Sequence, residues 1–438
     1  MKKVALSALA AAMMSGVVYA DTMTLYTDPK TGQVFTTAGE GRVEMGDFID
    51  AKSVDMANRE QSSSLSEYQE KMKKYVNVKS KAKTLEFSGT HYFGFTSANP
   101  ETTSSTVNES AGFELRRNYL QVKAYFNDKD YFRVTMDTTK ELGSDKTTYA
   151  YMYAKYAYLW LDQVLPYTGV EVGIAHRPWI DYEEHNSWHY RSFNKVVLEE
   201  KNNTYTESGV DLINSADLGM NFKTKTDNFS SEIGVFNGEG YHADKNAKNQ
   251  QNSRGMSLEW RLTGHILGDG KKVGKNDRTK DTYLNVSTYG MISQNHKDND
   301  VTVGDSSEYD RSIYGVHAVY NQPEFLLAAQ YFIAKDDLTD GTKTDKKYTG
   351  WSINGEFRPM TDWTVIGRYD NFKRENQPVT GADTIDYKGD KIIAGLAYKY
   401  NKNVSFIGSG KWINEENAAG DDNGYSKDVY MLTTEVKW

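Results

Sequence analysis

The sequence predicts an all-β fold, a 16-stranded antiparallel transmembrane β-barrel preceded by a short amino-terminal periplasmic helical segment. Three observations lead to this prediction. From Thr84 onward, apolar and polar residues alternate with a period of two. The links between these segments alternate between short and long. The mean hydropathy is −0.70 although aromatic residues make up 13% of the chain, because a barrel that is apolar only on alternate residues averages to a polar sequence.

Residues 1–20, "MKKVALSALAAAMMSGVVYA", have the features of a secretory signal peptide. Two lysines are followed by an apolar stretch over residues 4–14, and small or modest residues precede the expected cleavage before Asp21. The apolar stretch is too short to span a membrane as a helix. We therefore expect the chain to leave the cytoplasm.

Composition excludes several classes of function. The chain has no cysteine, which excludes thiol nucleophiles, thiolate metal sites and disulfides. Its formal net charge of −8 disfavours nucleic-acid binding. Glycine-rich phosphate-binding and calcium-binding loop patterns are absent from the sequence, so we expect no cofactor.

Residues 21–83 form the predicted periplasmic segment. The stretch "DPKTG" lies between two short strand-like runs, which predicts a small hairpin. Within residues 52–80 the period changes, and apolar residues spaced three, four and three apart predict an amphipathic helix. These residues are Leu65, Tyr68, Met72 and Tyr75. The helix could form a coiled coil or remain a solvated helix at the barrel rim.

Residues 84–438 contain sixteen alternating segments of about the 9–11 residues that a tilted spanning strand needs. The short links include "ND", "TD", "NQ", "RPM" and "NK". An even number of strands places both chain ends at the periplasmic rim, where the short turns also lie. The link "GDGKKVGKNDRT", residues 268–279, is longer than this alternation predicts.

The alternation also assigns side chains to faces, because an arginine or lysine facing lipid near the midplane costs roughly 2–4 kcal/mol. The predicted pore-lining basic residues are Arg117, Lys123, Arg133, Lys155, Arg261 and Arg368. The predicted inward acidic residues are Asp137, Glu259, Glu356 and Asp370. Strict alternation sends one of the adjacent Arg116 and Arg117 to the outer face. A basic ladder would favour anions, whereas a mixture of charges would simply solvate a wet channel.

Aromatic residues near strand ends predict interface girdles. The expected girdle residues are Tyr158, Trp160, Trp363, Tyr398, Tyr400 and Trp412. The last segment, "SKDVYMLTTEVKW", alternates in the same way and ends on Trp438. It resembles the carboxy-terminal signal by which the barrel-insertion machinery recognises outer-membrane barrel proteins.

The chain resembles Gram-negative outer-membrane porins, and within them the phosphate-selective porin O/P family. The resemblance rests on the amino-terminal heptad-like segment, the sixteen segments and "FELRRNYLQVKAYF", with the best local match at residues 115–126. It implies a homotrimeric channel in the outer membrane of a Gram-negative bacterium, in contact with outer-membrane lipid and lipopolysaccharide and with basic residues lining the pore.

The longest link, residues 177–215, follows the fifth segment, as does the loop that constricts general porins. By this resemblance we expect it to be the constriction loop. Its predicted site residues are Arg177, Asp181, Glu183, Glu184, His185, His189 and Arg191. Acidic and basic groups facing each other across a narrow opening would create a transverse field that sorts ions by sign.

Other interpretations of this loop are weaker. His185 and His189 are four residues apart, which allows a metal site, but no HExxH pattern is present. Ser187 lies near both histidines, but nothing marks a nucleophile elbow. A polar loop with no role in selectivity also remains open. We therefore expect neither a metal nor catalysis.

The functional prediction is a water-filled porin for passive diffusion of small hydrophilic solutes and ions, with anion preference as a hypothesis. The alternative is a surface barrel that acts mainly as an adhesin or as an envelope-anchoring structural protein. The acidic stretch "DYEEH" at the predicted constriction departs from a purely basic pore and weakens the case for phosphate specificity.

Overall fold

A computed structural model describes residues 22–49, 81–101, 110–142, 148–201, 209–238, 240, 255–297, 308–338, 345–376, 385–417 and 425–438. The predicted signal peptide and the predicted helix within residues 52–80 lie outside these residues. The chain divides into two compact units, Met1–Lys81 and Ala82–Trp438. Among the described residues, no helix is both long enough and apolar enough to cross a membrane.

The first unit contains a three-stranded antiparallel sheet. Its strands are β1 (Thr22–Thr27), β2 (Val34–Phe35) and β3 (Val43–Ile49), in the order β2-β1-β3. The link between β1 and β2 contains a tight turn in which the Gly32 N–H donates to the Asp28 carbonyl at 2.7 Å. Gly32 has a φ of 71°, a conformation that glycine adopts without a steric penalty.

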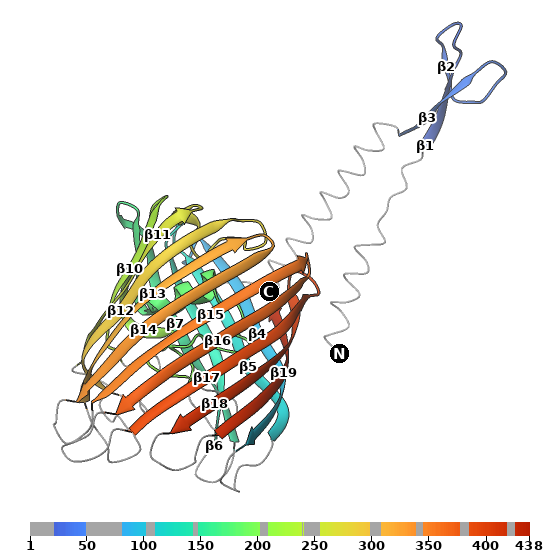
Figure 1. Ribbon diagram of the computed structural model, residues 1–438. Helices are drawn as coiled ribbons and strands as arrows, with labels where there is room; N and C mark the ends of the chain where they lie inside the picture. Colours follow the sequence, from blue (N-terminus) through green and yellow to red (C-terminus); the bar gives the residue numbers. More distant parts are fainter. Residues whose placement is uncertain are drawn as a thin grey trace. The chain divides into compact units, whose positions relative to one another are not determined.

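The second unit is a closed barrel of sixteen antiparallel strands, β4 to β19 (Figure 1). The strands are β4 (Thr84–Glu101), β5 (Ser110–Tyr125), β6 (Tyr131–Leu142), β7 (Thr148–Leu165), β8 (Thr168–His176), β9 (Ala216–Lys225), β10 (Phe229–Phe236), β11 (Ser257–Leu267), β12 (Tyr283–Lys297), β13 (Glu308–Gln322), β14 (Phe325–Leu338), β15 (Lys346–Met360), β16 (Trp363–Asn376), β17 (Ile385–Lys399), β18 (Val404–Asn417) and β19 (Tyr425–Lys437). The predicted fold class and the predicted number of barrel strands are therefore confirmed.

The strands are amphipathic across the wall. On β11, for example, Leu258 and Leu262 are exposed on the outside, whereas Glu259 and Arg261 are buried on the inside. A one-residue slip would turn the charged side chains outward and the leucines inward. The outer face thus presents the continuous apolar surface that a membrane requires.

A β-bulge on β5 interrupts the strict alternation of inward and outward side chains. On β5 the ladder with β4 pairs Tyr92 with Arg117 and Phe93 with Leu115, which leaves Arg116 as the extra residue. The prediction that Arg116 or Arg117 points outward is therefore wrong. Arg116 donates to carbonyl groups inside the barrel, and Arg117 lies over the inward-facing ring of Tyr119.

A second bulge lies on β7, where the ladder with β6 moves from Tyr156 directly to Ala154. The extra residue is Lys155, which is buried on the inside together with Tyr156. A bulge adds one residue to one strand and re-aims the side chains around it. The two bulges therefore add basic side chains to the lumen without placing any on the lipid face.

Two predicted girdle residues also face the lumen. Tyr158 is 2% exposed and contacts Arg133, and Trp160 packs with the same internal cluster. By contrast, Trp363 and Tyr398 lie side by side on the outer face, with ring centroids 4.7 Å apart. The β-propensity of aromatic residues explains the two inward ones.

Part of the inner wall is built from aromatic rings that cover glycines on the neighbouring strand. Tyr289 covers Gly315, and Phe332 covers Gly350. A Cβ atom placed on either glycine would lie 2.1 Å and 2.5 Å, respectively, from the nearest ring atom. The glycines therefore let these rings lie flat against the inner wall.

The carboxy-terminal residue extends the ladder between β19 and β4 that closes the barrel. The Trp438 N–H donates to the Gly89 carbonyl at 3.1 Å, and the Gly89 N–H donates to the Trp438 carbonyl at 2.8 Å. The indole Nε1 donates to Nε2 of His91 at 3.0 Å. Gly89 is required because a Cβ there would lie 2.5 Å from the Trp438 ring.

We predict that Gly89→Val displaces the Trp438 ring and lowers the yield of folded barrel, because the new side chain occupies the position of the indole. The measurement is the fraction of protein that migrates as the folded form on unheated denaturing gels. The matched control is Gly408→Val on β18, where a Cβ meets nothing within 4 Å. Equal yields for the two variants would contradict the prediction.

Candidate functional site: a luminal loop and the cavity beside it

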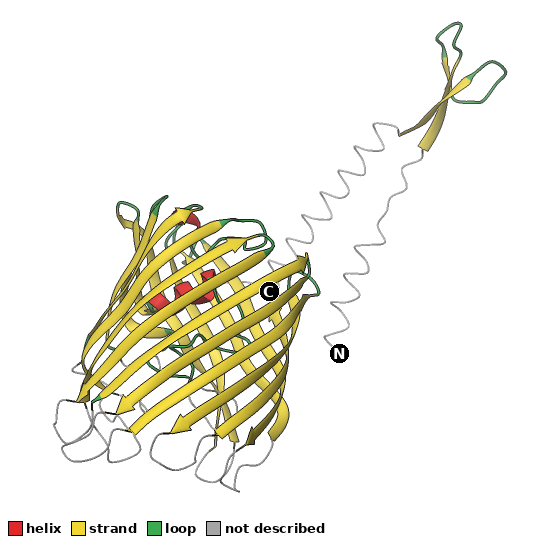
Figure 2. Ribbon diagram, in the orientation of Figure 1, coloured by secondary structure: helices red, strands yellow, loops and turns green. Residues whose placement is uncertain are grey.

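The segment between β8 and β9 folds into the barrel. It begins with helix α3 (Pro178–Asn186), which lies inside the ring of strands (Figure 2). Pro178 suits the first turn of a helix because its φ is already helical and its missing N–H would be unpaired there anyway. We call residues 177–201 and 209–215, the part of this segment that the structure describes, the luminal loop.

An apolar face of the luminal loop packs on one side of the barrel. Trp179 stacks on Tyr289 of β12, with ring centroids 3.6 Å apart and planes 9° from parallel. Val196, Val197 and Leu198 are fully buried in the same cluster. The wall contributes apolar side chains from β12 to β19, including Ile313, Phe332, Ile366, Ile393, Ile407 and Val429. Part of the lumen is therefore a packed protein core.

Buried charges also tie the luminal loop to the wall. Nε of Arg177 donates to Glu259 at 2.9 Å. Arg368 donates to the Lys195 carbonyl at 2.8 Å, and Arg311 donates to the Leu212 carbonyl at 2.8 Å. Lys391 pairs with Glu200. Buried pairs such as these define geometry more than they add stability, so the path of the loop is closely specified.

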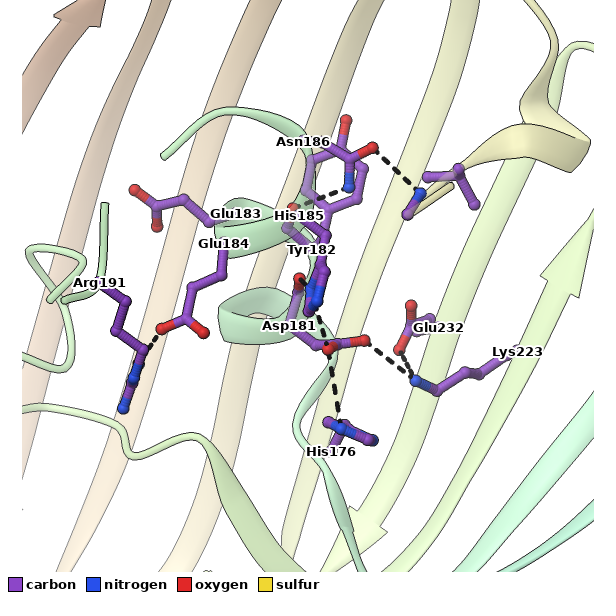
Figure 3. Close-up of polar contacts among 12 residues, drawn as sticks. His176, Asp181, Tyr182, Glu183, Glu184, His185, Asn186, Arg191, Lys223 and Glu232 are labelled. Atoms are coloured by element: carbon purple, nitrogen blue, oxygen red, sulfur yellow. Dashed lines mark hydrogen bonds and ion pairs between the residues drawn. The ribbon is translucent and has the colours of Figure 1, made fainter. Parts of the chain in front are cut away.

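A charge cluster anchors the first turns of α3 to β8, β9 and β10 (Figure 3). Nζ of Lys223 lies 3.1 Å from Glu171, 3.3 Å from Asp181 and 3.3 Å from Glu232. Burial alone would raise the pKa of Asp181, but His176 and Lys223 hold it well below its usual value. Asp181 therefore remains ionised and bonded to the wall.

Farther along the helix, Glu183 and Glu184 have different environments. Glu183 is 1% exposed and accepts a hydrogen bond from Gln330 of β14. Burial raises its pKa to about 7, although Arg368 opposes the shift. Glu184 instead forms an ion pair with Arg191, which also binds Glu199.

The long link between β11 and β12 also contacts the luminal loop. The Gly274 N–H donates to Oδ1 of Asn186 at 3.2 Å, and Val273 belongs to the apolar cluster that contains Trp179. Arg278 donates to Glu356 at 2.6 Å. This link is longer than a simple turn because it supports the carboxy-terminal end of α3.

A cavity of about 330 Å³ lies between the luminal loop and the opposite inner wall. Residues 191–195 of the loop line one side, and strands β4 to β7 line the other. Among the described residues, its basic side chains are Arg116, Arg117, Lys155, Arg191, Lys195 and Lys411, and its acidic ones are Glu114, Asp137 and Glu200. The cavity is therefore lined mainly by positive charge.

Tyrosine rings hold one of these cations in place. The guanidinium of Arg117 lies 4.3 Å from the Tyr119 ring centroid and 4.9 Å from that of Tyr92. The faces of aromatic rings attract cations. Asp137 is occupied by other groups, since it accepts hydrogen bonds from the backbone of Asn118 and from Tyr153.

The predicted pore-lining residues separate into three groups. Arg117 and Lys155 line the cavity. Arg133 binds Tyr158 at 3.2 Å, and Lys123 lies 3.5 Å from Glu86. Arg261 and Arg368 are buried and paired with Glu232 and Asp370, respectively.

Among the predicted constriction residues, only Arg191 lines the cavity. Arg177, Asp181 and Glu183 bind the wall. His185 contacts the Asp181 carbonyl at 2.7 Å through Nδ1, and burial lowers the pKa of His189, so that it is neutral at pH 7. Sequence reasoning missed Arg116, Lys195, Lys411, Glu114 and Glu200 as cavity residues. The alternation pattern could have identified Lys411, whereas Glu114 turns inward only because of the bulge at Arg116.

Solved structures similar to this chain are outer-membrane proteins. An anion-selective porin from Comamonas acidovorans has a TM-score of 0.55 and 12% identity, covering 81% of this chain and 99% of that one. OmpT, an outer-membrane protein of Vibrio cholerae, has a TM-score of 0.53 and 13% identity, covering 82% and 99%. An in-vitro folded trimer form of OmpT has a TM-score of 0.52 and 13% identity, covering 81% and 99%.

At these identities the likeness establishes the fold, which is that of porins. No protein-family model and no curated protein matches the chain. The narrower resemblance to phosphate-selective porins therefore remains a prediction.

We predict that loop packing weakens as pH rises from about 4.5 to about 7, because buried Glu183 has a pKa raised from 4.5 to about 7. The folded loop retains a proton that an unfolded loop would lose within this window, so folding is disfavoured toward higher pH. At pH 8 the free energy of folding is less favourable by about 3 kcal/mol than at a pH below 4.5. Thermal unfolding in detergent at pH 5 and pH 8 measures it.

The variant Glu183→Gln should remove most of this pH dependence, since it keeps an oxygen that can accept from Gln330 and cannot ionise. A pH dependence as large as that of the unmodified protein would refute the assignment to Glu183. Glu184→Gln is the control, because Glu184 is paired with Arg191 instead.

Proposed function

We propose that this protein is an outer-membrane porin, a water-filled channel through which small hydrophilic solutes and ions diffuse passively, with a preference for anions. The observation that carries the proposal is a closed sixteen-stranded barrel with a cavity beside its luminal loop. That cavity has six basic and three acidic side chains among the described residues. Fixed charges of one sign in a confined space raise the local concentration of counter-ions.

The way the charges are paired supports the anion preference. Glu114 binds Arg116 at 2.9 Å, Glu200 binds Lys391, and Asp137 accepts several hydrogen bonds. Each carboxylate of the cavity therefore already has a protein donor. Arg117, in contrast, contacts tyrosine rings and, among the described contacts, donates one N–H to the Tyr92 hydroxyl at 3.4 Å, so its other N–H groups can bind an anion.

The same proposal places the protein in the outer membrane of a Gram-negative bacterium, with Trp438 as part of the signal for barrel insertion. The apolar outer face fits contact with lipid and lipopolysaccharide. A homotrimer is proposed because one similar structure is described as a trimer form. The proposed protein is a passive channel and not an enzyme.

We predict steady ion conductance when the purified protein is inserted into planar bilayers. The reversal potential under a KCl gradient should have the sign of chloride preference. A barrel that acts as an adhesin or as an envelope anchor would give no steady channel. If the channel prefers potassium, the porin function stands, but the basic cavity does not determine ion preference.

We predict that the triple variant Arg117→Gln, Lys155→Gln and Lys411→Gln lowers the chloride preference, because it removes three of the six positive charges around the cavity. The permeability ratio should fall about twofold or more at low salt, where charges are least screened. The control is Lys123→Gln, near Glu86 and outside the cavity lining. An unchanged ratio in the triple variant would show that these cations do not set ion preference.

A further inference from the structure

The bulge on β5 brings Arg116 within hydrogen-bond distance of two backbone carbonyl groups of the luminal loop. Its Nη1 donates to the Ser192 carbonyl at 3.1 Å and to the Phe193 carbonyl at 3.2 Å. Its Nε donates to Glu114 at 2.9 Å, which orients the guanidinium. Since Arg116, Ser192 and Phe193 all line the cavity, this contact joins the wall and the loop at the edge of the opening.

The opposite side of the same loop segment is tied to other strands. Arg368 of β16 donates to the Lys195 carbonyl at 2.8 Å, and Lys391 of β17 pairs with Glu200. Residues 191–195 are thus held by Arg368 of β16 and by Arg116 of β5, and Lys391 of β17 holds the same loop farther along, at Glu200. The position of this segment relative to β5 determines how wide the cavity is.

The Arg116 contact also affects the charge at the opening. Backbone carbonyl oxygens that face a channel attract cations. Arg116 covers two such oxygens and places a positive charge beside them. Losing this contact would therefore widen the opening and expose groups that favour cations.

We propose that Arg116 is a positioning residue that sets both the width and the ion preference of the opening by holding the Ser192 and Phe193 carbonyls across the lumen. The inference rests on the proposed porin function. Arg117 is the matched comparison, since it is adjacent, has the same charge and lines the same cavity, but has no hydrogen bond to the loop among the described contacts.

The test compares Arg116→Ala, Arg117→Ala and Arg116→Lys in bilayers. Arg116→Ala should raise conductance and open-channel noise, admit larger neutral sugars in liposome swelling, and lower chloride preference. Arg117→Ala should lower chloride preference without the increase in noise. Arg116→Lys keeps a charged donor that can reach the carbonyls, so it should restore low noise. Equal noise and equal sugar cut-off in Arg116→Ala and Arg117→Ala would overturn the proposal.

A second measurement does not depend on conductance. The chain has no cysteine, so Ser192→Cys provides a single reactive site on the tethered segment. Its reaction with a charged thiol reagent should be about tenfold faster when combined with Arg116→Ala, because a hydrogen bond to a charged group is lost. Equal rates with Arg116→Ala and Arg117→Ala would refute the tether even if the barrel forms no channel. If the predicted difference in reaction rate is found but no channel conducts in bilayers, the porin function is rejected and the Arg116 tether is retained.

Each variant must first be shown to migrate as a folded barrel on unheated denaturing gels. Where Arg116→Ala does not fold, Arg116→Gln takes its place, since its shorter neutral side chain also removes the charge and lengthens the contact. The same increase in noise and in cysteine reactivity is expected, and their absence would count against the proposal equally.

Discussion

The requirement that every backbone amide in a lipid environment has a partner determines this structure. A sheet meets it only by closing on itself, and here β19 pairs with β4 from Ser426 to Lys437, with two further hydrogen bonds between Trp438 and Gly89. Closure fixes the side chains to two faces, which separates the apolar outer surface from the charged interior. The β-bulges at Arg116 and Lys155 interrupt the alternation of faces on β5 and β7, and both lie beside the cavity.

The interior is divided by chemistry. From β12 to β19 the inward face carries large apolar side chains such as Phe332 and Ile393, together with buried charged ones such as Arg368 and Lys391. The luminal loop packs on the apolar side chains, and full burial of each large one contributes about 1.5–3 kcal/mol. From β4 to β7 the residues that line the cavity are mainly arginine, lysine and tyrosine, with two carboxylates among them. One sheet therefore serves as a core on one side and as a channel wall on the other.

The barrel could be predicted from the sequence because the two-residue alternation of apolar and polar side chains recurs in sixteen successive segments. The assignment of residues 177–215 as a constriction loop came from resemblance and remains a prediction. The inward turn of Arg116 could not be predicted, since a bulge changes the parity of a strand without a distinctive residue. The pairing of Arg261 with Glu232 depends on a neighbouring strand, and that of Arg368 with Asp370, two residues away on its own strand, depends on side-chain conformation. Alternation identifies inward residues, but not which of them remain in contact with water.

The stack of Gly315, Tyr289 and Trp179 has a consequence for how this channel can change during evolution. The glycine lets the tyrosine lie flat on the wall, and the tyrosine carries the tryptophan of the loop. None of the three lines the cavity among the described residues, yet their combined thickness sets the distance of the loop from the wall. Substitutions behind the loop would therefore adjust the calibre of the passage while its charged lining stays the same.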